Sequence, residues 1–352
     1  MKRRASLILA RLFYCDLDSE ERLFTARRRI FAVGIASAVL FGAIPQAFAA
    51  RGTLSRASAP GDASKTVTDE VGRTVLVPAE VRRIVTLAPN LTEIIYALGL
   101  EDRLAGDTTY CDTPPAAKAK PHVGSPVSPS LEAIVALHPD LVLATTSINR
   151  VATADALDRL GIPVYTSDPH TVRGVLESIT HMAGLMGAAA EGAALVAQMQ
   201  ARLDALHARL KDQPPVAVLF VVWEDPLVTT GQNTFIADAL RWAGARSVIE
   251  SKQNYPHVTF EEVVRLKPDY IIVTGEHEGA DASEGASLRA RAGWKDIRAV
   301  QEGHVAVVGS EWDRPSPGLI DGIEQLARDL HPGAFAKPVA TNHRVRECAC
   351  AR

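Results

Sequence analysis

The sequence predicts an α/β protein of two similar lobes, each with a central sheet, joined by a long backbone helix. Three observations lead to this prediction. Strands and helices alternate along the chain, a helix-to-strand unit occurs twice, and a proline-free segment separates the two copies. Alternating strands and helices are typical of sheets that are covered by helices.

Composition sets the class of protein. The chain has 352 residues, of which 47% are hydrophobic and 22% charged, and this is enough for two lobes of ordinary domain size. The net charge is −3, and the body of the chain has no basic cluster with interleaved aromatic residues. We therefore expect no nucleic-acid partner.

The N-terminus has the pattern of an export signal. Arginines at 27–29 precede an apolar run at 30–44, and Ala47 and Ala49 provide the small residues before a cleavage site. The run is shorter than the ~20 residues of a spanning helix. We predict a cleaved signal at 1–49, by the general or the twin-arginine route, and a flexible leader at 50–65.

The first lobe is predicted to span 66–170. Turn formers at 69–73 separate two β-rich runs, which predicts a hairpin over 66–77. A buried strand is expected at 84–87, followed by a helix that runs to Leu98 with Asn90 or Thr92 as its cap.

The repeated unit is the most informative feature. Residues 130–145 match residues 259–274 at one constant offset, 261 − 132 = 129. Each copy has a cap residue, a short amphipathic helix, a Pro-Asp stop and an apolar strand. Each lobe should therefore contain the same helix-to-strand unit.

The region 171–212 is predicted to connect the lobes. It has no proline and is predicted to form one long helix or a pair of helices, because apolar residues recur at spacings of three and four at Leu195, Met199, Leu203, Leu206 and Leu210. The second lobe should span 213–332, with strands at 216–222 and 305–308. A disordered tail is expected at 333–352, and the role of its Cys348 and Cys350 is left open.

Five segments carry a family resemblance: 83–93, 110–115, the two copies of the repeat, and 310–317. Through them, residues 66–332 resemble the helical-backbone class of periplasmic binding proteins, which deliver cobalamin, ferric siderophores, haem or metal ions to ABC importers. The segments at 110–115 and 310–317 are most similar to those of the cobalamin-binding members.

The resemblance implies which side chains line a ligand cleft between the lobes. Aromatic surfaces with a few polar anchors suit a large, flat, partly apolar ligand. Aromatic walls of the family are replaced here by Pro126 and Thr145. The residues expected to line the cleft are Tyr110, Trp223, Tyr255, Glu311, Trp312, Asp313 and Arg314.

Glu132 and Glu261 occupy the same place in the two copies of the repeat. A carboxylate in the first turn of a helix is favoured by the helix dipole, which explains each residue separately. The resemblance implies a second role, in which each Glu docks onto an Arg of one permease subunit. One charge-assisted contact per lobe suits a two-fold symmetric partner.

Together these observations predict a monomeric periplasmic protein that captures a corrinoid such as cobalamin and delivers it to an ABC permease dimer with its ATPase subunits. A ferric siderophore or haem is the alternative ligand. A periplasmic enzyme is less favoured, because no nucleophile motif or phosphate loop is present. We expect no catalytic residues, no cofactor and no metal site.

Overall fold

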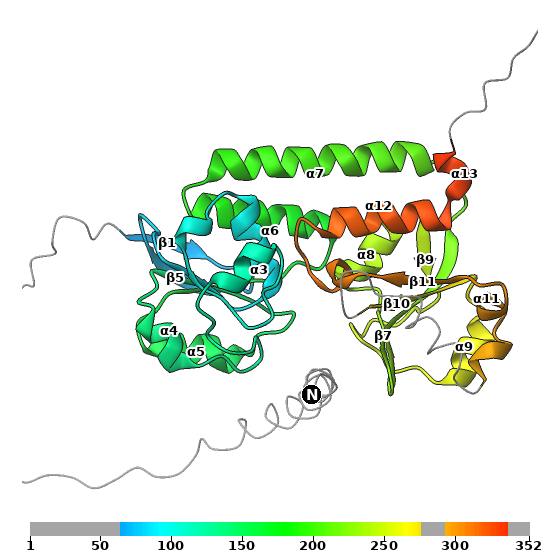
Figure 1. Ribbon diagram of the computed structural model, residues 1–352, viewed down its shortest axis with the longest axis horizontal. Helices are drawn as coiled ribbons and strands as arrows, with labels where there is room; N and C mark the ends of the chain where they lie inside the picture. Colours follow the sequence, from blue (N-terminus) through cyan, green and yellow to red (C-terminus); the bar gives the residue numbers. More distant parts are fainter. Residues whose placement is uncertain (1–63, 276–292, 337–352) are drawn as a thin grey trace, which may run out of the picture. The chain divides into compact units, whose positions relative to one another are not determined.

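The computed structural model describes residues 64–275 and 293–336, which belong to one compact unit, Asp62–Arg352 (Figure 1). The predicted signal at 1–49 and most of the predicted leader lie outside the described residues. The predicted hairpin is present: β1 (Ser64–Thr68) pairs antiparallel with β2 (Thr74–Pro78). The last two residues of the predicted leader are thus the first two of a strand.

The first lobe contains a four-stranded parallel sheet in the order β4-β3-β5-β6. Its interior strands are short and apolar, as expected for strands covered on both faces. The strands are β3 (Ile84–Thr86), β4 (Leu104–Gly106), β5 (Leu141–Thr145) and β6 (Val164–Ser167). The helical elements are α3 (Pro89–Ala97), η1 (Glu101–Arg103), η2 (Pro115–Ala119), α4 (Leu131–Ala136) and α5 (Val151–Arg159).

The second lobe has a sheet of the same order, with β7 between β9 and β10 and with β11 outside β10. These four strands are parallel, and β8 adds an antiparallel partner at the far end of β7. The strands are β7 (Val216–Glu224), β8 (Leu227–Thr229), β9 (Ala245–Ser247), β10 (Tyr270–Thr274) and β11 (Val305–Val308). The helical elements are α8 (Phe235–Trp242), α9 (Phe260–Leu266), η3 (Trp294–Asp296), α11 (Arg298–Gln301) and η4 (Ser310–Asp313).

The repeated unit folds in the same way in both lobes. Ser130 and Thr259 cap α4 and α9, because each hydroxyl accepts a hydrogen bond from the backbone amide three residues on. Each helix is followed by a residue with positive φ, His138 at 45° and Lys267 at 49°.

The two aspartates that follow this turn also have matching roles. Asp140 accepts hydrogen bonds from the backbone amides of Arg82 and Arg83, just before β3. Asp269, 129 residues later, accepts one from Ala217 in β7. The duplication predicted from the sequence therefore extends to the way each unit is joined to its sheet.

One predicted cap is wrong. Helix α3 begins at Pro89, after Ala88, and has no side-chain cap. Asn90 and Thr92 are both buried within the helix, and the Thr92 hydroxyl hydrogen-bonds to Thr86 at 2.6 Å. Pro89 suits the first position of this helix, because the backbone N–H there would have no partner within the helix and proline has no N–H to satisfy.

The connecting region is a pair of helices, α6 (Val172–Leu185) and α7 (Ala189–Leu210). They approach closely at Gly192, where a Cβ would lie 2.3 Å from the Cβ of Ala183. Helix α12 (Leu319–Leu330) also packs against α7 (Figure 1). The predicted tail starts at 333, but Pro332–Phe335 form α13, and the guanidinium of Arg209 in α7 lies over the ring of Phe335. Residues 337–352, with Cys348 and Cys350, lie outside the described residues.

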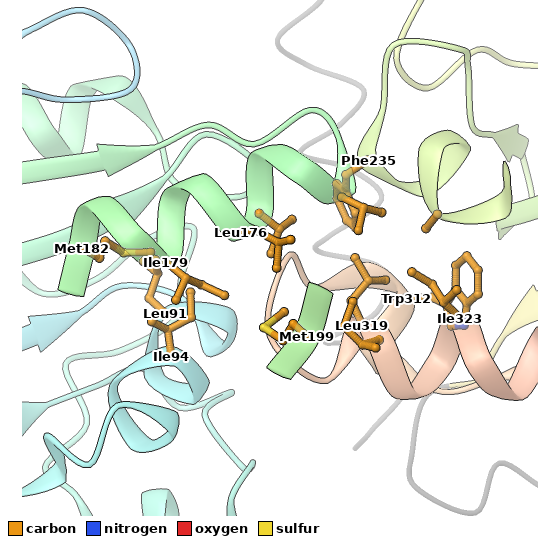
Figure 2. Close-up of a cluster of buried hydrophobic side chains, with 14 of the residues drawn as sticks. Leu91, Ile94, Leu176, Ile179, Met182, Met199, Phe235, Trp312, Leu319 and Ile323 are labelled. Carbon is orange, nitrogen blue, oxygen red and sulfur yellow. The ribbon is translucent and has the colours of Figure 1, made fainter. Parts of the chain in front are cut away.

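One apolar core joins the two lobes. It runs from α3 in the first lobe through α6 and α7 to α8 and α12 in the second, as Figure 2 shows for Leu91, Ile94, Leu176, Ile179, Met182, Met199, Phe235, Leu319 and Ile323. Because close-packed cores resist shear, this shared core restricts how far the lobes can move apart. Within 64–275 and 293–336, no helix has the length and apolar character needed to cross a membrane.

Candidate functional site

The predicted site residues follow the carboxyl ends of parallel strands, where α/β sheets bind ligands. Tyr110 comes after β4, Trp223 is the last residue but one of β7, and residues 311–314 come after β11. Both lobes therefore contribute candidate side chains from the same kind of position.

Arg314 makes contacts from the second lobe to the first. Its Nη1 donates a hydrogen bond of 2.9 Å to Oε1 of Glu93 in α3, and both Nη atoms lie 3.4 Å from Oδ1 of Asp112. The side chains of Arg314 and Glu93 are only 17% and 11% exposed. Burial raises the pKa of Glu93, although Arg314 acts in the opposite direction.

Glu93 is a site residue that the sequence analysis missed. It stands on α3 among buried residues such as Leu91, Ile94 and Ile95. A carboxylate on a buried helix face needs a partner, since burying an unpaired charge is costly. A charged residue on a buried helix face was therefore the signal that the sequence offered. This signal does not identify the residue that pairs with Glu93.

Asp313 and Tyr255 form a second part of the candidate site. Asp313 is exposed, and partial desolvation by neighbouring protein atoms raises its pKa to about 7, although the charge of Arg314 acts in the opposite direction. Tyr255 is partly buried, and desolvation together with the charge of Asp313 raises its pKa to about 12. The charge of Asp313 thus acts on the Tyr255 phenol.

Trp312 was predicted to line the cleft, but the structure places its side chain elsewhere. Its side chain is fully buried in the shared core (Figure 2). Its ring centroid lies 5.6 Å from that of Phe220 in β7. A Cβ at Gly322 of α12 would lie 2.7 Å from the indole Nε1, so the indole lies directly on the backbone of that helix.

Glu311 is turned toward its own loop. Its Oε1 accepts a hydrogen bond of 3.2 Å from the backbone amide of Gly309, and its side chain also approaches Gly322. Of the four consecutive candidates at 311–314, the structure thus directs Trp312 into the core and Glu311 toward the loop and α12. Asp313 and Arg314 keep the polar surroundings expected of site residues.

Tyr110 and Trp223 keep accessible aromatic surface. Tyr110 is 37% exposed. Trp223 is half-buried, and its Nε1 donates a hydrogen bond of 2.8 Å to the carbonyl of Asp225. At the position of one replaced aromatic wall, Thr145 is fully buried at the end of β5.

The acidic pair lies on the surface of the repeated helices. Glu132 and Glu261 are both exposed and each is the second residue of its helix. The Ser130 hydroxyl donates to Oε2 of Glu132 at 3.0 Å, and the backbone amide of Glu132 itself and this hydroxyl lower the pKa of Glu132. In Figure 1, α4 and α9 both lie on the side of the unit away from α7.

Among the described residues, no group of three or more His, Cys, Asp or Glu side chains is arranged to hold a metal ion.

Comparison with known proteins places these features in a wider group. Residues 84–312 match the model of a family described as periplasmic binding protein. An uncharacterized ABC transporter substrate-binding lipoprotein of Bacillus subtilis is 33% identical over 279 residues, which are 77% of this chain and 86% of the relative.

Two solved structures are also similar. The periplasmic vitamin B12 binding protein of Vibrio cholerae has a TM-score of 0.64 and 27% identity, covering 73% of this chain and 99% of the other. The periplasmic heme-binding protein BhuT, in complex with two hemes, has a TM-score of 0.64 and 30% identity, covering 73% of this chain and 100% of the other.

Proposed function

Because this chain belongs to the periplasmic binding protein family, as a solute-binding protein of ABC importers, we propose that it captures a cobalamin-type corrinoid between its lobes and delivers it to a permease. The observation that carries the proposal is the set of aromatic side chains with accessible surface, Tyr110, Trp223 and Tyr255, which come from both lobes. Aromatic side chains with a few polar anchors suit a bulky, partly apolar ligand.

The similarity to the vitamin B12 binding protein of Vibrio cholerae supports the corrinoid. We propose the periplasm as the place of action, reached through the export signal of the sequence. The core shared between the lobes fits a binding protein whose two halves close by a small motion.

Haem is the second candidate ligand, and one observation favours it. The phenol of Tyr110 is exposed, and a Tyr oxygen is one of the groups that bind haem iron. The similarity to the heme-binding protein BhuT points in the same direction.

One experiment separates the two ligands. The purified protein is incubated with cyanocobalamin or with hemin, passed through a desalting column, and its absorption spectrum is recorded for the wild type and for Tyr110→Phe. A corrin band retained by both proteins supports the corrinoid. Retention of hemin alone, with a changed spectrum in Tyr110→Phe, would establish haem instead.

For delivery, we propose that Glu132 and Glu261 dock onto cationic side chains of the two permease subunits. Both are exposed, and they occupy equivalent places in a duplicated unit. Changing either Glu to Ala should leave cyanocobalamin affinity unchanged and impair uptake into reconstituted vesicles. Arg at both positions should impair uptake further, because like charges would meet. Normal uptake by the double Arg variant would leave only the helix-dipole role.

A further inference from the structure

Each lobe exposes a valine at the same place in the repeated unit. Val135 in α4 is 41% exposed and Val264 in α9 is 48% exposed. Their offset is 264 − 135 = 129, the offset of the repeat. Each valine lies three residues after the exposed Glu of its helix, and residues at this spacing are neighbours on a helix surface.

Core packing accounts for these two side chains only in part, since about half of each stays exposed. The neighbouring residues Ile134 and Val263 are fully buried and anchor the two helices to their lobes. The exposed position therefore contributes little to the core. Valine is also a weaker helix former than alanine, because branching at Cβ restricts its side chain against the preceding turn.

The exposed faces of the two helices agree only in part. Glu132 and Val135 have counterparts of the same type in Glu261 and Val264. The next exposed residue is alanine in one copy and arginine in the other, at 136 and 265. The shared feature is thus a carboxylate beside an isopropyl group, presented once by each lobe. The two helices lie on the same side of the unit (Figure 1).

We propose that Val135 and Val264 are contact residues for the permease, each receiving the aliphatic part of the cationic side chain whose charged end pairs with the neighbouring Glu. Arg and Lys carry apolar stems of this kind below their charged groups. The occupant is a two-fold symmetric protein that presents one such side chain per subunit. This inference rests on the docking role proposed for Glu132 and Glu261.

The two halves of such a contact respond differently to salt. The attraction between exposed charges is screened as ionic strength rises, whereas burial of an aliphatic group is not. A contribution from the valines should therefore persist at salt concentrations that weaken the contribution of the glutamates.

The test measures binding of the full chain, loaded with cyanocobalamin, to its permease–ATPase complex in nanodiscs. Val135→Thr and Val264→Thr keep the branched shape and replace one methyl group by a hydroxyl. Each single variant should weaken binding several-fold, and the double variant on the order of tenfold. The loss should be the same at low and high salt. Val71→Thr is the matched control, because Val71 in the hairpin turn is also 41% exposed.

Three further outcomes decide the inference. Loss of binding in the double Arg variant of Glu132 and Glu261, with normal binding by the double Thr variant, would overturn the valine contact and leave the docking role intact. Unchanged binding in both double variants would overturn the docking role itself. Self-association of the wild-type protein that the Thr changes abolish would assign the surface to a second copy of this chain instead.

Discussion

Nη1 of Arg314, in the loop after β11, donates a hydrogen bond of 2.9 Å to Oε1 of Glu93 in α3, 221 residues earlier in the chain. This contact joins the second lobe to the first beside the candidate ligand residues. Both side chains are largely buried, so the Glu93 carboxylate depends on Arg314 for a cationic partner.

Replacing Arg314 by Met should lower the free energy of unfolding by about 2–4 kcal/mol, because the buried Glu93 carboxylate loses its cationic partner. Urea titration measures the change. Arg82→Met is the control, since Arg82 and Glu80 form an exposed pair, 73% and 68% exposed, whose loss should change stability little. Adding Glu93→Gln to Arg314→Met should recover part of the loss. Equal effects in Arg314→Met and Arg82→Met would contradict a structural role for the interlobe pair.

Trp312→Ala should reduce stability by about 3–5 kcal/mol, because the indole is fully buried between β7 and α12. Trp223→Ala removes a half-buried ring at the end of β7, and it should mainly weaken cyanocobalamin binding. Denaturant titration and calorimetric binding on both variants separate the two effects. If Trp312→Ala unfolded like the wild type and bound less ligand, Trp312 would line the cleft after all.

Asp313 should make stability depend on pH. Its pKa is about 7 in the folded protein, against an ordinary value of 3.8, so the folded state binds more protons than the unfolded state between these values. Stability due to this group is therefore fully present below about pH 4 and is lost as the pH rises to about 7. The melting temperature of Asp313→Asn, relative to the wild type, should be more favourable at pH 8 than at pH 5. The same difference at both pH values would contradict the raised pKa.

The same residue should affect ligand binding. A large neutral ligand that covers Asp313 removes more of its hydration and so favours the neutral form. Cyanocobalamin should bind the wild type more tightly at pH 6 than at pH 8, and Asp313→Asn should bind equally well at both. Titration at the two pH values measures this, and a pH-independent wild type would show that the ligand does not cover Asp313.

Much of the fold could be predicted from the sequence because its signals are local. The apolar runs of β5 and β10 and the caps Ser130 and Thr259 depend on residues a few positions apart. Hydrophobic period, capping and chain-stop signals act over such distances. The start of α3 was predicted wrongly because Pro89 can begin a helix, while Asn90 and Thr92 can each cap one. The structure starts the helix at the proline.

The roles of the candidate site residues stay a prediction. Tyr110, Trp223, Asp313 and Arg314 keep the exposure or the polar surroundings expected of site residues. Only the tertiary structure decided that Trp312 packs into the core and that Arg314 pairs with Glu93. The direction of a loop side chain depends on which surfaces lie next to it. The missing side chain of Gly322 leaves room for the Trp312 indole, and the buried carboxylate of Glu93 attracts the Arg314 guanidinium. Those surfaces come from distant parts of the chain, so no local pattern specifies them.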